Sequence, residues 1–354
     1  MLTRHHDACL LRPEDLVPSQ DDLEVVGVFN PGAATTGHGE EVALLVRVAE
    51  CPNEKRPGFA ALPRWDVDSS RVVIDWVPHD ELTVVDPRIM EVKKTGLWRL
   101  TFTSHIRVIR SPDGRSVQSV DGSRFLPATP YEEFGVEDPR ITPIGDTFYF
   151  TYVAVSRHGA ATALASTQDF QTFTRHGIIF CPENKDVVLF PERIGGQYAA
   201  LHRPNTGSPF CTPEMWLARS TDLIHWGRHE HFLGGAGTWD TGRTGAGTPP
   251  IRTPDGWFAI YHGNQRETVD GVVGAYAAGA LLLDLENPAR IIARAPDPVL
   301  TVAAEHERHG FVPNVIFPTG IVQRGDALLI YCGAADSATG LVELSWQELR
   351  AVLP

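Results

Sequence analysis

The strongest constraint on the fold is a degenerate repeat in which a tight turn is followed by an apolar strand. Four copies are plain, and each has a Gly/Asp or Gly/Gly turn of the kind that joins two hairpin strands. They read ITPIGDTFYFTYVAVS (141–156), FPERIGGQYAALHRP (190–204), PPIRTPDGWFAIYHGN (249–264) and FPTGIVQRGDALLIYCGAAD (317–336). A fifth copy with a looser turn covers residues 28–50. Repetition of one strand–turn–strand unit indicates an all-β protein built from similar small sheets.

The spacing of these turns favours a β-propeller. The turns begin at Gly145, Gly195, Asp255 and Gly325, so they follow one another after 50, 60 and 70 residues. Such intervals suit blades of several short strands. The longer interval before the 141–156 copy must hold extra strands, such as SRVVIDWV and GLWRLTFTSHIRVI. A pair of stacked sheets is the alternative, but repetition of one unit favours five blades around an axis.

We therefore predict a single domain, a five-bladed β-propeller over residues 1–354. Residues 1–25 would form an N-terminal extension, and residues 338–354 a C-terminal closing segment. Amphipathic helix patterns are almost absent, apart from a short candidate at SWQELRAVL near the C-terminus.

The charge and the cysteines narrow the class of protein. A formal charge of −13 and a pI near 5.5 oppose binding to nucleic acids or anionic membranes. No stretch approaches the length of a membrane span, and no signal peptide is indicated. The five cysteines are odd in number and free of C-x-x-C pairs, so neither a disulfide framework nor a metal site is predicted. We expect a cytoplasmic protein whose partners are small molecules, and a homo-oligomer stays open as an alternative.

Polar residues recur where the repeated strands begin and end. Corresponding strand ends converge on one face of a propeller, so these residues can be considered together. The strand ends supply Arg47, His202, Arg203, His262 and Asp336, and the segments leading into strands supply Asn30, Glu137, Asp138, Lys185 and Arg243. Four of them, Lys185, Arg203, Arg243 and His262, would surround one carboxylate. Cations grouped in an acidic chain indicate an anionic ligand, most simply phosphate.

Simpler interpretations stay open for several residues. Asp138 precedes a proline and could be an ordinary turn residue. His202 and His262 follow apolar strand residues without a metal-type partner at i+2 or i+4, so both could be structural. Glu132 and Glu133 are expected to be solvated surface carboxylates. The segment GRTGAG (242–247) resembles a phosphate loop, but two prolines follow where a helix would have to begin, so no nucleotide site is predicted.

Four segments, in order along the chain, carry a resemblance to a known family. GVEDPRIT, KDVVLFPERIGGQYAALHRP, TGRTGAGTPPI with GWFAIYHG, and YCGAAD resemble the motif set of glycoside hydrolase family 130, the β-mannoside phosphorylases and related β-mannosidases. The resemblance runs from about Phe29 to Asp336. It implies a five-bladed β-propeller and inverting phosphorolysis of a β-mannoside to α-mannose 1-phosphate. Inorganic phosphate would be the co-substrate, and no cofactor is expected.

The resemblance also implies roles for single residues. Asp138 falls on the family's proton donor, and Glu137 would support its loop. The phosphate-site positions are Lys185, Arg203 and His262, together with Arg243, which replaces the lysine of many relatives and keeps its charge. The sugar-contacting positions are Asn30, Arg47 and Asp336. Lys55 or Arg56 is a more loosely aligned candidate for the acceptor sugar. His202, beside Arg203, is counted among the substrate-binding residues.

The chemistry of a phosphorylase explains why one acid and several cations would suffice. An inverting hydrolase uses two carboxylates, one to protonate the leaving oxygen and one to activate water. Phosphate is already a nucleophile, so a cationic site can replace the second carboxylate. Asp138 would be the acid, held on a constrained turn by Pro139. In the family the proton is thought to travel through a mannose hydroxyl.

Three functions stay under consideration. An inverting β-mannoside phosphorylase agrees best with the cations. An inverting β-mannosidase of the same fold should have acidic residues in their place. A non-catalytic sugar-binding propeller would tolerate the loss of Asp138, which stands here in its full motif.

Overall fold

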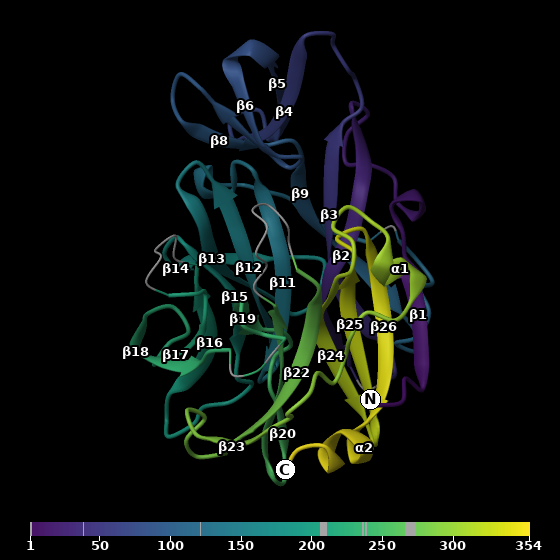
Figure 1. Cartoon of the computed structure of the whole chain (residues 1–354), viewed down its shortest axis with the longest axis vertical. Helices are drawn as coiled ribbons and strands as arrows, with labels where there is room; N and C mark the ends of the chain where they lie inside the picture. The colour runs from purple at the N-terminus through teal and green to yellow at the C-terminus, as the bar shows by residue number, and fades with distance from the viewer. Residues whose placement is uncertain are drawn as a thin grey trace.

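The computed structural model describes residues 2–37, 39–120, 122–205, 211–235, 237, 239–265 and 274–354. These residues form five large antiparallel sheets, two smaller ones and few helices (Figure 1). Each large sheet has a path of four strands, and most hydrogen-bonded neighbours along it are also neighbours in sequence. The prediction of an all-β protein is therefore confirmed.

The strands are assigned to the five sheets as follows. The first sheet contains β2 (Leu23–Thr35), β3 (Val42–Pro52), β9 (Thr103–Ser111) and β10 (Arg124–Phe125). The second contains β11 (Gly135–Ile144), β12 (Thr147–Ser156), β13 (Gly159–Thr167) and β14 (Thr174–Phe180). The third contains β15 (Asn184–Leu189), β16 (Tyr198–Pro204), β17 (Met215–Ser220) and β18 (Trp226–Leu233). The fourth contains β19 (Arg243–Ala246), β21 (Gly256–Asn264), β22 (Tyr276–Leu283) and β23 (Ile291–Arg294), with β20 (Ile251–Thr253) also paired to β21. The fifth contains β1 (His6–Leu11), β24 (Ile316–Arg324), β25 (Ala327–Ala334) and β26 (Ala338–Ser345).

The sequence repeats correspond to one hairpin in each sheet. The five copies fall on the pairs β2–β3, β11–β12, β15–β16, β20–β21 and β24–β25. Gly145, Gly195 and Gly325 have positive φ values of 59°, 59° and 58°, which explains why glycine begins these turns.

The two ends of the chain meet in the fifth sheet. Strand β1 pairs with β26, with His6 opposite Glu343, so an N-terminal strand completes a sheet made of C-terminal strands. The segment predicted as an N-terminal extension thus contains β1, and the predicted closing segment contains β26. The predicted C-terminal helix is α2 (Trp346–Ala351), where the Ser345 side chain accepts a hydrogen bond from the Glu348 backbone. The remaining helices are η1 (Pro13–Asp15), η2 (His79–Glu81), η3 (Pro130–Glu132) and α1 (Glu305–Arg308).

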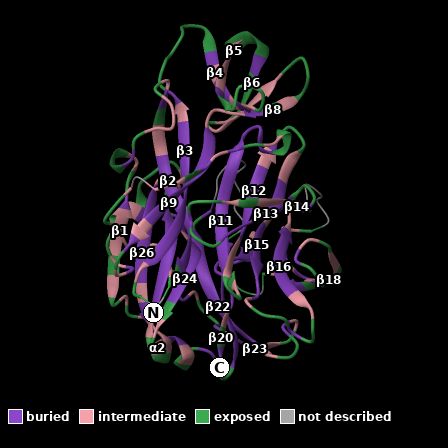
Figure 2. Cartoon of the chain, turned by 180° about the vertical axis from the view of Figure 1, so that it is seen from behind, coloured by how far each residue is buried: buried purple, intermediate pink, exposed green. Residues whose placement is uncertain are grey.

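Five apolar clusters hold the sheets together, each between two neighbouring sheets. One cluster joins the first sheet to the second through Leu45, Ile106, Phe150 and other residues. Similar clusters join the second sheet to the third, the third to the fourth, the fourth to the fifth and the fifth to the first. The sheets therefore pack in a closed cycle, with buried residues running along central strands such as β11 and β22 (Figure 2).

The interval between β3 and β9 forms a separate structure at one end of the molecule (Figure 1). It contains a hairpin of β4 (Phe59–Asp66) and β5 (Arg71–Pro78), and a sheet of β6 (Leu82–Asp86), β7 (Ile89–Val92) and β8 (Leu97–Leu100). We call residues 53–102 the excursion. The extra strands expected before residue 141 are confirmed: β5 and β8 lie in the excursion, and β9 lies in the first sheet. Among the described residues, no helix has the length and apolar character needed to cross a membrane.

Candidate active site

A cavity of about 1090 Å³ lies where the ends of the sheets meet the excursion. Nine of the eleven predicted site residues line it: Asn30, Arg47, Arg56, Glu137, Asp138, Lys185, Arg203, Arg243 and Asp336. The other two, His202 and His262, do not. Residues from four sheets and the excursion therefore converge, although as many as 306 positions separate Asn30 from Asp336 in the sequence.

A repeated backbone feature places the polar side chains. Strands β2, β11 and β15 each have a β-bulge, at Phe29/Gly32, Glu137/Arg140 and Lys185/Val188. Within these bulges Asn30, Asp138 and Asp186 have left-handed φ values of 52°, 51° and 55°. Asn and Asp tolerate this conformation better than most residues, and a bulge redirects a side chain out of the alternation of its strand. The repeated unit thus supplies one inward polar residue from each of three sheets.

Asp138 is buried, with a relative exposure of 6%, and is fixed by three neighbours. Its Oδ1 accepts hydrogen bonds from Asn30 Nδ2 at 2.7 Å and from Arg47 Nη1 at 3.0 Å. Its backbone carbonyl accepts from Arg140 Nη1 at 2.8 Å. Burial alone would raise the pKa of Asp138, but the positive charges of Arg47, Lys185 and Arg140 outweigh it and lower that pKa.

Two further carboxyl groups line the cavity, and their pKa values are raised, whereas that of Asp138 is lowered. Glu137 Oε1 accepts a hydrogen bond from Arg47 Nη2 at 2.7 Å. Burial raises the pKa of Glu137, and the charge of Asp138 adds to this effect against that of Arg47. Burial also raises the pKa of Asp336, again with a contribution from Asp138. Arg47 therefore lies among three acids, and its Nε also donates to Ser104 Oγ at 3.1 Å.

Three of the four predicted cations, Lys185, Arg203 and Arg243, also line the cavity. Lys185 and Arg203 lie opposite each other across β15 and β16, and Arg243 begins β19 in the next sheet. His262 is fully buried behind Arg203, with its Nε2 3.2 Å from Arg203 Nη1. Burial lowers the pKa of His262 to about 4, so this histidine is neutral at neutral pH. It supports the cations and does not itself line the cavity.

His202 lies outside the cavity lining. Its ring stacks on Phe180 with centroids 4.6 Å apart, and its nitrogens lie 3.0 Å from Asn184 Nδ2 and 3.1 Å from His229 Nδ1. Burial lowers the pKa of His202 to about 3. These surroundings fit the structural histidine that the sequence left as the alternative.

The expectation that Glu132 and Glu133 are solvated was wrong. Glu132 has a relative exposure of 1%, accepts from Tyr152 OH at 2.7 Å and accepts from the backbone of Ala128 and Thr129. It thus satisfies N–H groups at the start of η3, which the sequence pattern did not reveal. Glu133 forms an ion pair with Arg157 at 2.5 Å.

Asp186 was missed by the sequence reasoning. Its side chain is fully buried beneath the cations, with Oδ2 2.7 Å from Arg203 Nη1 and 3.2 Å from His262 Nε2. Burial opposes its ionisation, but the charges of Arg203 and its neighbours hold the pKa of Asp186 well below its usual range. Asp186 occupies the same position in its repeated unit as Asn30 and Asp138 do in theirs, and this match could have identified it from the sequence.

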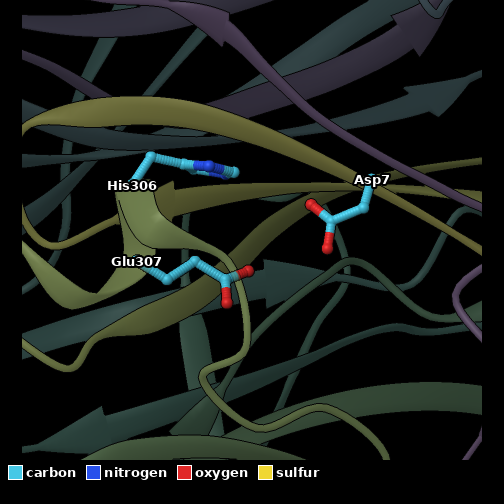
Figure 3. Close-up of side chains that lie close together, drawn as sticks. All are labelled: Asp7, His306 and Glu307. Carbon is cyan, nitrogen blue, oxygen red and sulfur yellow. The ribbon is translucent and has the colours of Figure 1, made fainter.

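A second group of titratable residues comes from β1 and α1 (Figure 3). Asp7, His306 and Glu307 place potential metal-ligand atoms within 4.8 Å of one another. Arg4 already neutralises the two carboxylates, because its Nη1 lies 2.6 Å from Asp7 Oδ2 and 2.8 Å from Glu307 Oε1. Glu307 also caps α1 by accepting from the backbone of Ala303 and Ala304. We therefore interpret this group as structural and assign no metal to it.

Comparison with known proteins places the chain among carbohydrate-active enzymes. The sequence model of a family described as beta-1,4-mannooligosaccharide phosphorylase matches residues 101–353. A beta-1,2-mannobiose phosphorylase of Listeria innocua serovar 6a is 39% identical over 352 residues, which cover 98% of this chain and 96% of the relative. A 1,2-beta-oligomannan phosphorylase of Thermoanaerobacter sp. is 34% identical over 253 residues, covering 70% and 81%.

A solved structure agrees with these sequence similarities. The beta-1,2-mannobiose phosphorylase from Listeria innocua, in a complex with beta-1,2-mannobiose, superposes with a TM-score of 0.89 at 38% identity. The superposition covers 97% of this chain and 96% of that protein. It therefore includes most of the excursion, which precedes the residues matched by the family model.

Proposed function

Because the chain belongs to glycoside hydrolase family 130 and is a β-mannoside phosphorylase, we propose that it splits β-1,2-mannobiose with inorganic phosphate. The observation that supports a β-1,2 linkage is the similarity to the Listeria innocua enzyme over 98% of the chain. That similarity extends through the excursion, where Arg56 and Trp76 line the cavity and the Arg56 guanidinium lies 4.0 Å from the centre of the Trp76 ring. The products would be α-mannose 1-phosphate and mannose.

The two parts of the cavity lining suit the two substrates. Phosphate would bind at Lys185, Arg203 and Arg243, because positive charges with several N–H groups match its oxygens. The mannose that is transferred would lie near Asn30, Arg47 and Asp336, and the acceptor mannose towards the excursion. This arrangement places the acid Asp138 between the phosphate site and the sugar sites.

The reaction follows from these positions. A phosphate oxygen attacks the anomeric carbon from the face opposite the glycosidic oxygen, and the bond from that carbon to the glycosidic oxygen breaks. Asp138 supplies the proton that the departing oxygen needs, directly or through a sugar hydroxyl. A single attack inverts the configuration, so a β-mannoside yields the α-phosphate.

The low pKa of Asp138 leads to a prediction about anion binding. An acid must hold a proton, whereas Arg47, Lys185 and Arg140 favour its ionised form. A bound dianion next to Lys185 would offset this positive charge and raise the pKa of Asp138. Binding of the anion should therefore take up a proton, and affinity should increase as the pH falls from the pKa of Asp138 in the complex towards its lower pKa in the free protein.

Sulfate is a suitable probe because it does not titrate near neutral pH. We expect calorimetric titrations with sulfate, in mildly acidic buffers of different ionisation enthalpy, to show net proton uptake. The Asp138→Asn variant should bind sulfate with little proton uptake. Equal uptake by the two proteins would assign the proton to Glu137 or Asp336 instead.

We also propose that the five sheets are the blades of a five-bladed propeller forming one domain with the excursion. The cycle of apolar clusters supports this arrangement. The cytoplasmic location and a homo-oligomeric state stay predictions. Cys9, Cys51, Cys181 and Cys332 are free thiols, as a reducing compartment would favour.

The experiment that tests the proposal is incubation of the protein with β-1,2-mannobiose, with and without inorganic phosphate. We expect consumption of mannobiose only with phosphate, and a mannose 1-phosphate of α configuration by NMR. Release of two mannose molecules at the same rate without phosphate would identify a hydrolase. Preference for a β-1,4-linked mannobiose would contradict the proposed linkage.

A further inference from the structure

Asp186 is a buried charged group next to the proposed phosphate site, and the reaction described above does not use it. We propose that it is a positioning residue that holds Arg203 in the orientation required for phosphate binding. This inference rests on the proposed role of Arg203 in the phosphate site. It concerns a residue that touches neither substrate, because Asp186 does not line the cavity.

The contacts of Asp186 connect it to the phosphate site. Its Oδ2 is 2.7 Å from Arg203 Nη1, and both side chains are almost fully buried. Arg203 lines the cavity, and its Nε is buried without a hydrogen-bond partner among the described residues. A guanidinium fixed at one Nη atom keeps its remaining N–H groups in a defined plane, which suits recognition of an oxyanion.

His262 completes this arrangement from the other side of Asp186. Its Nε2 lies 3.2 Å from Asp186 Oδ2, and burial keeps the ring neutral. The same Nε2 atom lies 3.2 Å from Arg203 Nη1. His262 therefore packs against both members of the Asp186–Arg203 pair.

The segment GRTGAG (242–247) leaves room for the side chains of Asp186 and His262. A Cβ atom at Gly245 would lie 2.5 Å from His262 Nε2 and 2.6 Å from Asp186 Oδ2. Only glycine allows β19 to approach the pair so closely. The segment that resembles a phosphate loop thus serves the phosphate site indirectly, by admitting Asp186 and His262 behind Arg203.

Asp186 also lies near Arg140, the arginine that holds the backbone of the acid. Arg140 Nη2 lies 3.9 Å from Asp186 Oδ1, while Arg140 Nη1 donates to the Asp138 carbonyl and Nε donates to the Gly247 carbonyl at 2.8 Å. The Asp186 carboxylate therefore lies between Arg203, which is in the proposed phosphate site, and Arg140, which donates to the backbone of Asp138.

The test is the Asp186→Asn variant, since Asn tolerates the left-handed backbone and keeps the shape of the side chain. We expect the KM for phosphate to increase about tenfold or more, and the KM for mannobiose to change by less than about twofold. Titration with inorganic phosphate alone should show the same loss of affinity. The matched control is Glu307→Gln, which removes the charge from another buried carboxylate–arginine pair, and it should leave the KM for phosphate unchanged.

A double variant distinguishes positioning from a general structural effect. If Asp186 acts through Arg203, adding Asp186→Asn to Arg203→Ala should change the KM for phosphate by less than about twofold. Multiplicative effects, or an unchanged KM in Asp186→Asn alone, would overturn the inference. If the single variant does not fold, Gly245→Ala provides the test, because its methyl group would displace the pair and should also raise the KM for phosphate. A wild-type enzyme that does not need phosphate would instead refute the proposed function.

Discussion

Replacing Asp138 by Asn should lower kcat/KM for mannobiose phosphorolysis on the order of 10²-fold or more while the protein still folds. The amide oxygen can still accept from Asn30 and Arg47, and Asn is well suited to the left-handed backbone at φ 51°. The variant therefore removes the transferable proton and the negative charge, and it keeps the shape and the accepted hydrogen bonds of the side chain. Alanine would be a poorer choice, because it would disfavour this φ value and leave Asn30 and Arg47 without an acceptor.

Thermal unfolding and phosphate titration provide the controls for this variant. The unfolding temperature should stay close to that of the wild type, and phosphate should still bind, since the cations are untouched. The parallel variant Glu137→Gln should retain more activity than Asp138→Asn, because Glu137 would only hold Arg47. If Glu137→Gln is the more damaging change, the acid has been assigned to the wrong carboxylate.

The sequence predicted those parts of the protein in which one local pattern is repeated. A glycine at a hairpin turn and alternating apolar residues are local features, so β11–β12 or β24–β25 could be recognised without knowledge of their neighbours. The excursion does not repeat the unit, and its division into two small sheets was not predicted. Its place beside the cavity depends on contacts between distant segments.

The candidate site was also predicted only in part, for the same reason. Asp138 stands at the bulge of one repeated unit, Lys185 and Arg203 face each other in the next unit, and the family resemblance named all three. Burial is a property of the whole fold, so the sequence could not show that His262 lies behind Arg203 or that His202 faces away from the cavity. Glu132 looked like a surface acid because its partners, the Tyr152 hydroxyl and two backbone N–H groups, become neighbours only on folding.

The second large effect is expected for Arg203, and it separates phosphate binding from sugar binding. Arg203→Ala removes donors aimed at an oxyanion, so the KM for phosphate should increase more than about tenfold, or roughly 1.4 kcal/mol. Mannobiose binding measured without phosphate should stay nearly unchanged. The reverse is expected for Asp336→Ala, because a carboxylate there would accept from mannose hydroxyls and repel phosphate. Calorimetric titration of each variant with phosphate and with mannobiose measures both effects.

The stability of the Arg203 variants depends on how well the buried charge of Asp186 is still neutralised. Arg203→Ala leaves Asp186 buried without its closest cation, and breaking such a pair typically costs about 3–5 kcal/mol of folding free energy. Arg203→Lys keeps the charge and loses the planar fork, so it should fold well and still bind phosphate weakly. Adding Asp186→Asn to Arg203→Ala should restore stability without restoring phosphate affinity. If Arg203→Ala weakens the binding of mannobiose alone, Arg203 belongs to the sugar site, and phosphate must bind elsewhere in the cavity.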